Sequence, residues 1–211
     1  MTPSSDSLAE AAPVPDCPPA SHQTQFLKAF FRNAGQVGAI APSSSGLSSV
    51  LADTLDWDNL GCLVEYGPGT GSVTAMIVDR LREGTRFFAI ERDPVFATTT
   101  RGRFPGVEVV EDCVTRVPEI CRERGIGQVD AILSGLPWAS FPPDLQDRAL
   151  EAMFEILPPG GRFATFAYLQ GLLLPAGQRF RRFLEGNFSS VSRSRVVWRN
   201  LPPAFVYQCV R

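Results

Sequence analysis

The sequence predicts an α/β fold in which a doubly wound, seven-stranded and mostly parallel sheet ends in an antiparallel hairpin at its C-terminal edge. Three observations predict this fold. From residue 62 onward, short strand-like runs alternate with helical periods. A glycine-rich turn follows the first run, and an acidic residue stands in or directly after each of the first three. With 211 residues, of which 44% are hydrophobic, the chain can fill the core of one such domain.

The elements follow one another in a regular order. We expect strands over 62–66, 86–91, 107–111, 129–134 and 162–169, each followed by a helix, over 72–81, 94–103, 117–124, 145–157 and 175–185. Five such units in a row indicate parallel strands, because each helix carries the chain back to the end of the sheet where the next strand begins. Two further apolar runs, 188–198 and 204–210, have no helix between them, so the turn at 200–203 predicts the closing hairpin.

The first 59 residues precede this domain, which we place at 60–211. Residues 1–23 contain thirteen Pro, Ser or Ala residues and no apolar periodicity, which predicts a disordered leader. The segment 24–59 is expected to hold an amphipathic helix, a loop and a short helix over 46–55. The first helix has apolar residues on one side and cations on the other: Phe26, Leu27, Phe30, Phe31, Ala34 and Val37 against Lys28 and Arg32. That helix either packs on the domain core or lies in a membrane interface.

Cysteine use and charge narrow the functional classes. Five cysteines without a Cys-x-x-Cys pair, together with a single histidine, argue against a bound metal, and the odd count without a signal peptide favours the reducing cytoplasm. No stretch is long and apolar enough for a transmembrane helix. The net charge of −2 conceals a basic segment, since residues 162–211 contain eight arginines and one acid. Such a segment suits an anionic partner, either phospholipid or nucleic acid, although arginines also simply keep an apolar segment in solution.

The segment 64–74 reads VEYGPGTGSVT and joins the first strand to a helix. Its glycines, Gly67, Gly69 and Gly71, allow the backbone to turn sharply and to approach a ligand at the start of that helix. Dinucleotide-binding proteins carry a comparable turn. The Gly-x-Gly-x-x-Gly spacing of nicotinamide-binding folds is missing, however, so a nicotinamide cofactor fits less well.

Three acidic residues narrow the choice of ligand. Glu65 stands in the strand before the glycine turn, where a carboxylate can neutralise an ammonium group. Glu91 ends the second strand, twenty residues after Gly71, at the place where a carboxylate binds a ribose diol. Asp112 ends the third strand beside Cys113, where an adenine can lie. Three acids at three successive strands favour a ligand site over a purely structural role.

In these residues the sequence resembles the class I S-adenosylmethionine-dependent methyltransferases, over roughly residues 60–211. The resemblance implies a Rossmann-like fold and S-adenosyl-L-methionine as the cofactor, with S-adenosyl-L-homocysteine as its product. It also implies a role for each residue of the site. Glu65, Gly67, Gly69 and Gly71 would line the methionine end, Glu91 the ribose, and Asp112 with Cys113 the adenine. Ser134, where strand four ends at the reacting centre, is expected beside both cofactor and substrate.

The segment 134–138 reads SGLPW and follows strand four. Relatives that methylate nucleobase amines carry Asn or Asp before the Leu-Pro or Pro-Pro pair, where the side chain accepts hydrogen bonds from the target amine. Here Gly135 occupies that position, and Trp138 provides the aromatic ring. A nucleobase would lose its acceptor, whereas the face of a tryptophan holds an alkyl ammonium by cation–π attraction. The glycine therefore favours an aliphatic amine as the substrate.

A second resemblance agrees with this interpretation. Residues 28–44 (KAFFRNAGQVGAIAPSS), the Ser-x-x-Pro pattern of 134–137 and Tyr168 in strand five are similar to bacterial phospholipid N-methyltransferases. That resemblance implies stepwise methylation of phosphatidylethanolamine to phosphatidylcholine, or methylation of an ornithine lipid, by a cytoplasmic enzyme held peripherally at the inner face of the membrane. Its contacts with the anionic surface would be Phe26, Leu27, Phe30, Phe31, Lys28 and Arg32.

The proton of the amine needs an acceptor. The only histidine, His22, lies in the leader, so we expect Tyr168 or a strand-end carbonyl to orient the amine or pass its proton to water, with Trp138 and Ser134 beside it. The C-terminal third also suits an amphiphile, because residues 172–174 are leucines and an arginine cluster can receive a phosphate. That cluster comprises Arg179, Arg181, Arg182, Arg193, Arg195 and Arg199.

Two functions compete with lipid methylation. An RNA adenine N6-dimethyltransferase would share the fold, but Gly135 and the absence of lysine clusters disfavour it. A cofactor-binding protein without catalysis would share the glycine turn and the acids. We expect no nucleic-acid partner, no metal and a monomeric protein.

Overall fold

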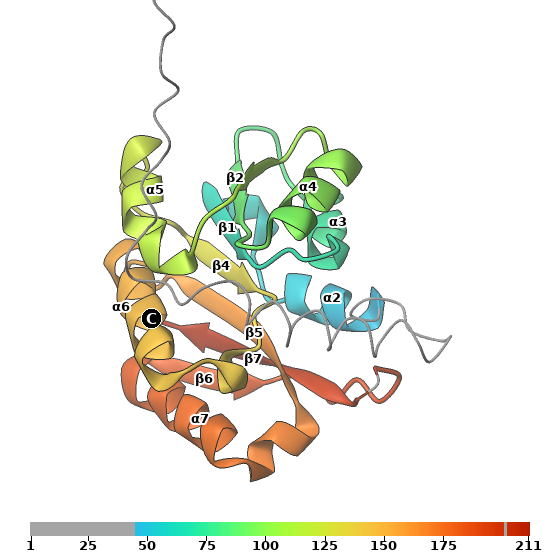
Figure 1. Cartoon of the computed structure of the whole chain (residues 1–211), viewed down its shortest axis with the longest axis vertical. Coiled ribbons are helices and arrows are strands. Elements are labelled where there is room, and N and C mark those ends of the chain that lie inside the picture. The colour runs from blue at the N-terminus through green and yellow to red at the C-terminus, as the bar shows by residue number, and fades with distance from the viewer. Residues whose placement is uncertain (1–44, 201) are drawn as a thin grey trace, which may run out of the picture.

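The computed structural model describes residues 45–200 and 202–211 and contains a seven-stranded sheet (Figure 1). Its strands are β1 (Cys62–Tyr66), β2 (Arg86–Ile90), β3 (Glu108–Val110), β4 (Ala131–Ser134), β5 (Arg162–Tyr168), β6 (Ser190–Arg193) and β7 (Ala204–Val210). They lie in the order β3-β2-β1-β4-β5-β7-β6. The first five pair in parallel, and β7 is antiparallel to both β5 and β6. The predicted sheet and its closing hairpin are confirmed.

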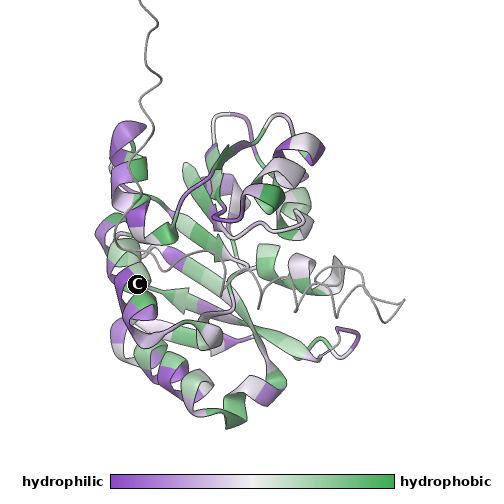
Figure 2. Ribbon diagram, in the orientation of Figure 1, coloured by the Kyte–Doolittle hydropathy of each residue, from purple (hydrophilic) through white to green (hydrophobic). Residues whose placement is uncertain are grey.

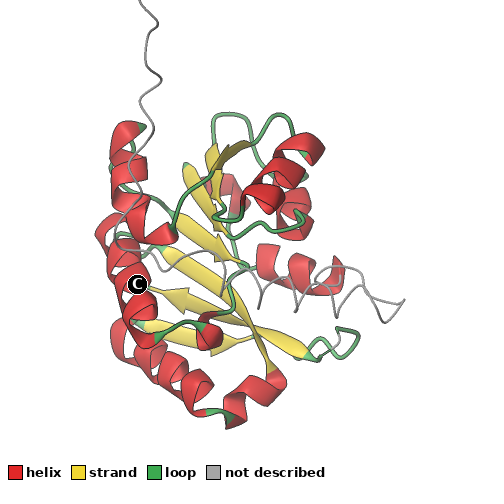
Figure 3. Ribbon diagram, viewed as in Figure 1, coloured by secondary structure: helices red, strands yellow, loops and turns green. Residues whose placement is uncertain are grey.

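Helices cover both faces of the sheet, as a doubly wound fold requires (Figure 3). The helices are α2 (Ser45–Ala52), α3 (Ser72–Val78), α4 (Pro94–Arg103), α5 (Val117–Glu123), α6 (Pro143–Ile156) and α7 (Pro175–Asn187). One apolar cluster joins α2 and α3 to one face of the sheet, and a larger one joins α5, α6 and α7 to the other. Hydrophobic residues follow the strands, and hydrophilic residues follow the outer sides of the helices (Figure 2).

Local sequence explains where several elements begin and end. The side chain of Asp93 accepts hydrogen bonds from the amides of Val95 and Phe96, and Pro94 occupies the first turn, so α4 begins where predicted. The predicted strand 188–198 was too long. Its regular ladder with β7 ends at Arg193, where the hydroxyl of Ser194 accepts the amide proton of Val206 at 2.9 Å in place of a backbone carbonyl, and beyond it an isolated bridge joins Val197 to Ala204.

The domain predicted at 60–211 gains one helix, since Leu47 and Leu51 of α2 pack in the same apolar cluster as Leu63 of β1. The leader, 1–23, and the amphipathic helix with its apolar and cationic residues, 24–37, lie outside the described residues. Within 45–200 and 202–211, no helix combines the length and the apolar character that crossing a membrane requires.

Candidate active site

The glycine turn lies at the carboxyl end of β1. Gly67, Gly69 and Gly71 all adopt positive φ angles, of 67°, 57° and 81°, which L side chains rarely adopt. The amide of Gly67 donates to the carbonyl of Ile90 at 2.9 Å, and the amide of Gly71 donates to that of Pro68 at 2.8 Å. The first contact attaches the turn to the end of β2, so the turn stands beside the acid that follows this strand.

Glu91 connects the glycine turn to the start of α4. One carboxylate oxygen, Oε2, accepts a hydrogen bond from the amide of Gly69 at 3.0 Å, and the other, Oε1, accepts one from the amide of Asp93 at 2.9 Å. The side chain is buried, and this burial raises its pKa, while the two amides act in the opposite direction. Glu91 therefore sets the distance between the turns that follow β1 and β2.

Asp112 and Cys113 follow β3 and extend the same wall. Asp112 Oδ1 accepts the amide proton of Cys113 at 2.7 Å, and Oδ2 accepts a hydrogen bond from Arg116 Nη1 at 2.9 Å. A carboxylate oxygen has two lone pairs, so both oxygens keep a position for a ligand. The structure thus brings the acids that follow β2 and β3 to one edge of the sheet.

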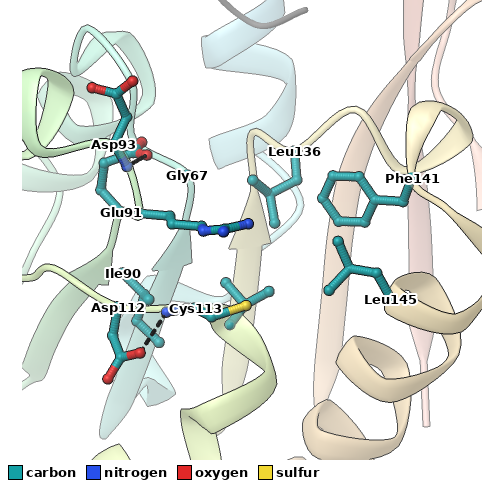
Figure 4. Close-up of a pocket in the computed structure, with 11 residues that line it drawn as sticks. Gly67, Ile90, Glu91, Asp93, Asp112, Cys113, Leu136, Phe141 and Leu145 are labelled. Carbon is teal, nitrogen blue, oxygen red and sulfur yellow. Dashed lines mark hydrogen bonds between the residues drawn. The ribbon is translucent and has the colours of Figure 1, made fainter. Parts of the chain in front are cut away.

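These residues form one wall of a small cavity (Figure 4). Gly67, Glu91, Asp112 and Cys113 lie on one side, and the side chains of Leu136, Phe141 and Leu145 face them from the other. One wall is thus polar and the other apolar, which suits a nucleoside with hydroxyl groups on one side and an aromatic ring. The sequence did not reveal the apolar wall, since Phe141 and Leu145 carry no local signature and only the crossover from β4 to α6 brings them here.

Glu65 is buried behind the glycine turn and does not line this cavity. Its Oε2 accepts a hydrogen bond from Thr74 Oγ1 at 2.8 Å, and its Oε1 has no partner among the described residues. Burial raises its pKa to about 8, the charge of Glu91 adds to the rise, and the bond from Thr74 opposes it. An unpartnered buried carboxylate oxygen beside the turn is a position where an ammonium group gains a hydrogen bond and a charge partner.

The raised pKa of Glu65 predicts that the ligand-free fold loses stability as the pH rises. The folded state keeps a proton up to about pH 8, whereas an unfolded glutamate releases it near pH ~4.3. This stabilisation is complete below the unfolded pKa and is lost as the pH rises through the folded one, at up to ~1.4 kcal/mol per pH unit. We expect the unfolding free energy, measured with urea, to fall less between pH 5 and pH 8 in Glu65→Gln than in the wild type. Equal losses in the two proteins would contradict the assignment.

Ser134 holds the segment that follows β4. Its side chain is fully buried, and its Oγ accepts hydrogen bonds from Trp138 Nε1 at 2.9 Å and from the amide of Leu136 at 3.2 Å. Its carbonyl accepts a bond from Thr165 Oγ1 at 3.1 Å. The hydroxyl therefore fixes the ring of Trp138 relative to the end of the strand.

Loss of this hydroxyl leaves two donors without an acceptor. We expect Ser134→Ala to lower the unfolding free energy by about 1–3 kcal/mol, the usual cost of an unsatisfied buried donor. The control is Ser192→Ala, because Ser192 is exposed and its hydroxyl donates one hydrogen bond, to Gln208 Oε1 at 3.3 Å, so its change should stay within about 0.5 kcal/mol. Urea denaturation measures both values, and equal stabilities would show that the hydroxyl does not hold the segment.

Gly135 has a steric reason to be glycine. A Cβ atom at this position would lie 2.6 Å from the carbonyl oxygen of Gly67, a backbone atom that no change of rotamer can move. The amide of Gly135 also donates to the carbonyl of Tyr66 at 2.8 Å. The segment that follows β4 thus lies directly against the glycine turn, and no side chain fits between them.

Trp138 is buried in an aromatic cluster. Its ring stacks on Phe180 with 5.6 Å between centroids and 6° between planes, and it meets Phe163 edge-on. Phe180 therefore covers one face of the ring, and Phe141 packs against the ring at a tilt with 5.5 Å between centroids. The cation–π contact predicted for Trp138 stays a prediction.

A second cavity of about 240 Å³ lies on the other side of the segment that follows β4. Its walls are mainly aromatic and apolar and include Trp138, Phe166, Tyr168, Leu172, Phe180 and Tyr207. Burial raises the pKa of Tyr168 well above its usual value, so its hydroxyl stays protonated. The buried hydroxyl of Tyr207 has no partner among the described residues, and no sequence pattern indicated it. The structure thus brings Trp138 and Tyr168 together, while Ser134 supports Trp138 from behind.

The segment between the cavities is their common wall. Leu136 and Phe141 line the first cavity, and the four residues between them line the second. A group held in the first cavity and a group held in the second would therefore meet at this segment, beside the carboxyl ends of β1 and β4. This arrangement suits a transfer between two bound molecules.

Comparisons with known proteins agree with this arrangement. No family model matches the chain. The chain is 36% identical over 187 residues to the ornithine lipid N-methyltransferase of Singulisphaera acidiphila, across 87% of this chain and 93% of that protein. An O-methyltransferase from Bacillus cereus, solved in complex with S-adenosylhomocysteine, shares the fold of this chain, with a TM-score of 0.62 at 13% identity. The match covers 89% of this chain and 91% of that one. An O-methyltransferase of tomaymycin synthesis from Streptomyces achromogenes, solved with S-adenosylmethionine, also shares the fold. Its TM-score is 0.60 at 17% identity, and the match covers 81% of this chain and 80% of that one.

Proposed function

Because the chain belongs to the class I S-adenosylmethionine-dependent methyltransferases, we propose that it methylates the amine of a lipid headgroup, and that this lipid is an ornithine lipid. The observation that carries the proposal is the 36% identity to an ornithine lipid N-methyltransferase over nearly the full length of both chains. The sequence patterns alone favour phosphatidylethanolamine as the substrate. Both lipids present a primary alkyl amine, and the relative supports the ornithine headgroup over the ethanolamine one.

The residues of the first cavity fit the cofactor. When bound, S-adenosylmethionine supplies an electrophilic methyl group on a sulfonium. We propose that Glu91 accepts hydrogen bonds from the ribose, that Asp112 and Cys113 hold the adenine, and that Phe141 packs against its ring. Glu65 would serve the methionine ammonium together with Gly67, Gly69 and Gly71. Two observations support this fit: the unpartnered oxygen of Glu65 and the pairing of a polar with an apolar wall.

The second cavity suits the amine. An alkyl ammonium has a pKa of ~10.4, so its neutral form costs ~4.6 kcal/mol at pH 7 in water. An apolar, aromatic cavity disfavours the charged form and reduces this cost. The protonated hydroxyl of Tyr168 can orient the amine nitrogen toward the first cavity but does not remove its proton. The strand-end carbonyls stay available to guide that proton to water.

The role of Tyr168 is testable by removal of one oxygen atom. We expect Tyr168→Phe to lower kcat by about tenfold to a hundredfold at an unchanged cofactor Kd, since a positioned hydrogen-bonding group contributes on this scale. Tyr66→Phe is the control, because the hydroxyl of Tyr66 is fully buried, unpartnered in the described chain and lines neither cavity. Steady-state kinetics on lipid in mixed micelles compare the two. An unchanged kcat for Tyr168→Phe would remove this residue from the reaction.

The proposed function is tested by offering three substrates with radiolabelled S-adenosylmethionine: ornithine lipid, phosphatidylethanolamine and ribosomal RNA. We expect label in methylated ornithine lipid. Label in phosphatidylethanolamine alone would restore the headgroup that the sequence patterns put first. Label in RNA alone would overturn lipid methylation and would show that another group replaces the acceptor missing at Gly135.

A further inference from the structure

The mouth of the second cavity carries an apolar lip. Leu172 lies in the 3₁₀ turn η4 (Leu169–Leu173) and lines the cavity, and Leu174 lines the cavity as well. Leu173 is 81% exposed and Leu174 is 55% exposed. Burial of a leucine side chain is worth ~1.5–3 kcal/mol, so two adjacent exposed leucines favour contact with another apolar phase.

The connection between β6 and β7 contacts the start of η4, a few residues before this lip. The amide of Leu169 donates to the carbonyl of Pro203 at 2.9 Å, and Ala204 lies between Tyr168 of β5 and Val197 of the connection. The next residue, Trp198, is 68% exposed. Both segments lie in the lower part of the view, at the end of β5 (Figure 1). Of the five exposed large hydrophobic residues in the described chain, three thus lie on these two neighbouring segments.

Positive charge accompanies the apolar residues. Arg193, Arg195 and Arg199 are exposed around Trp198, and no carboxylate in the described part of the chain forms an ion pair with any of them. Two of the three arginines of α7 differ, since Arg179 pairs with Asp147 at 2.7 Å and Arg181 pairs with Glu185 at 2.7 Å. Exposed apolar side chains bordered by unpaired arginines complement an anionic lipid surface.

We propose that Leu173, Leu174 and Trp198 insert into an anionic bilayer while Arg195 and Arg199 lie among its headgroups. The second cavity then opens directly onto the membrane, and a lipid amine reaches Tyr168 while its acyl chains stay in the bilayer. This membrane-docking surface rests on the proposed function and is separate from the amphipathic segment 24–37. It explains how a cavity too small for a two-chain lipid serves a lipid substrate.

The test compares full-length variants on phosphatidylglycerol–phosphatidylcholine vesicles by flotation. We expect Leu173→Ser with Trp198→Ser to weaken vesicle binding by about tenfold for each residue. Arg195→Ala with Arg199→Ala should weaken it by about fivefold for each residue, with a smaller loss at high salt. The control is Val78→Ser, at an exposed apolar residue of α3, which should bind as the wild type does because α3 lies far from the lip (Figure 1).

A second readout separates docking from catalysis. On a short-chain lipid with the same amine headgroup, monomeric in solution, Leu173→Ser should keep the wild-type kcat and KM, because Leu173 does not line the cavity. Wild-type vesicle binding by both double variants would overturn the docking surface. If the wild type binds cofactor but methylates neither ornithine lipid added to the vesicles nor the monomeric lipid, the proposed function fails instead, and flotation still decides the docking surface.

Discussion

Replacement of Gly135 by alanine is expected to lower the rate of methyl transfer by about a hundredfold and to weaken cofactor binding with it. The added Cβ would lie 2.6 Å from the carbonyl oxygen of Gly67, and neither atom can move away by a change of rotamer. The glycine turn and the segment that follows β4 must therefore separate, and a displacement of less than 1 Å between reacting groups costs a large part of the rate. Calorimetric titration with S-adenosylhomocysteine and kinetics under saturating cofactor measure the two effects.

Gly102→Ala is the matched control for this variant. A Cβ atom at Gly102 meets nothing within 4 Å, and the residue lies inside α4, where alanine is favoured over glycine. This variant should keep full activity and gain stability. If Gly135→Ala kept the wild-type rate as well, the close approach to Gly67 would not constrain the site.

The close approach of Gly135 to Gly67 gives a second reason for a glycine at this position. From the sequence, Gly135 indicates a substrate that does not need the amide acceptor of base-methylating enzymes. The structure adds that the larger side chain has no room, so Gly135→Asn should inactivate the enzyme without creating activity on adenine. Substrate choice and backbone packing thus favour the same residue.

Replacement of Glu91 by glutamine is expected to weaken cofactor binding by about a hundredfold and to destabilise the fold. Each carboxylate oxygen accepts an amide proton, one from Gly69 and one from Asp93. An amide side chain has only one acceptor oxygen, so its NH2 group would face a buried N–H group, and bonds to charged groups are worth ~1.5–3 kcal/mol. The proposed ribose contact would be lost together with the two amide hydrogen bonds. The combined loss corresponds to a change in the cofactor Kd of about a hundredfold.

Glu111→Gln is the control for this change. Glu111 is exposed, and its contact with Arg101 spans 3.5 Å at the surface, so neither the cofactor Kd nor the melting temperature should change measurably. Calorimetric titration and thermal unfolding of both variants complete the test. A Glu91→Gln protein with wild-type cofactor affinity would exclude the ribose contact.

The sequence was sufficient for the order of elements and for the proximity of the polar residues of the candidate site. Gly67, Glu91 and Asp112 stand at the ends of successive strands, and the carboxyl ends of parallel strands meet at one edge, so their proximity follows from the pattern alone. Element ends were less accurate. The helix predicted over 72–81 stops at Val78, where the chain turns and the side chain of Arg80 reaches Asp53 at 2.7 Å.

The apolar half of the site could not be predicted in the same way. The sequence predicted Trp138 as an aromatic residue of the candidate site, but its stacking on Phe180 joins positions 42 residues apart and depends on how α7 crosses the sheet. Tyr207 comes from the antiparallel strand β7, whose register with β5 determines which side chains face the second cavity. Such contacts belong to the tertiary structure and leave no local trace in the sequence.

The wall between the two cavities has a consequence for how such an enzyme evolves. Leu136 and Phe141 line the first cavity, which we propose for the cofactor, while Ala139 and Ser140 line the second, which we propose for the amine, so selection for a new amine and selection for the cofactor would act on different side chains of one short stretch. A descendant can exchange Ala139 or Ser140 and adapt to another headgroup while it inherits the donor chemistry unchanged. Substrate range can thus diverge within a lineage faster than the reaction itself.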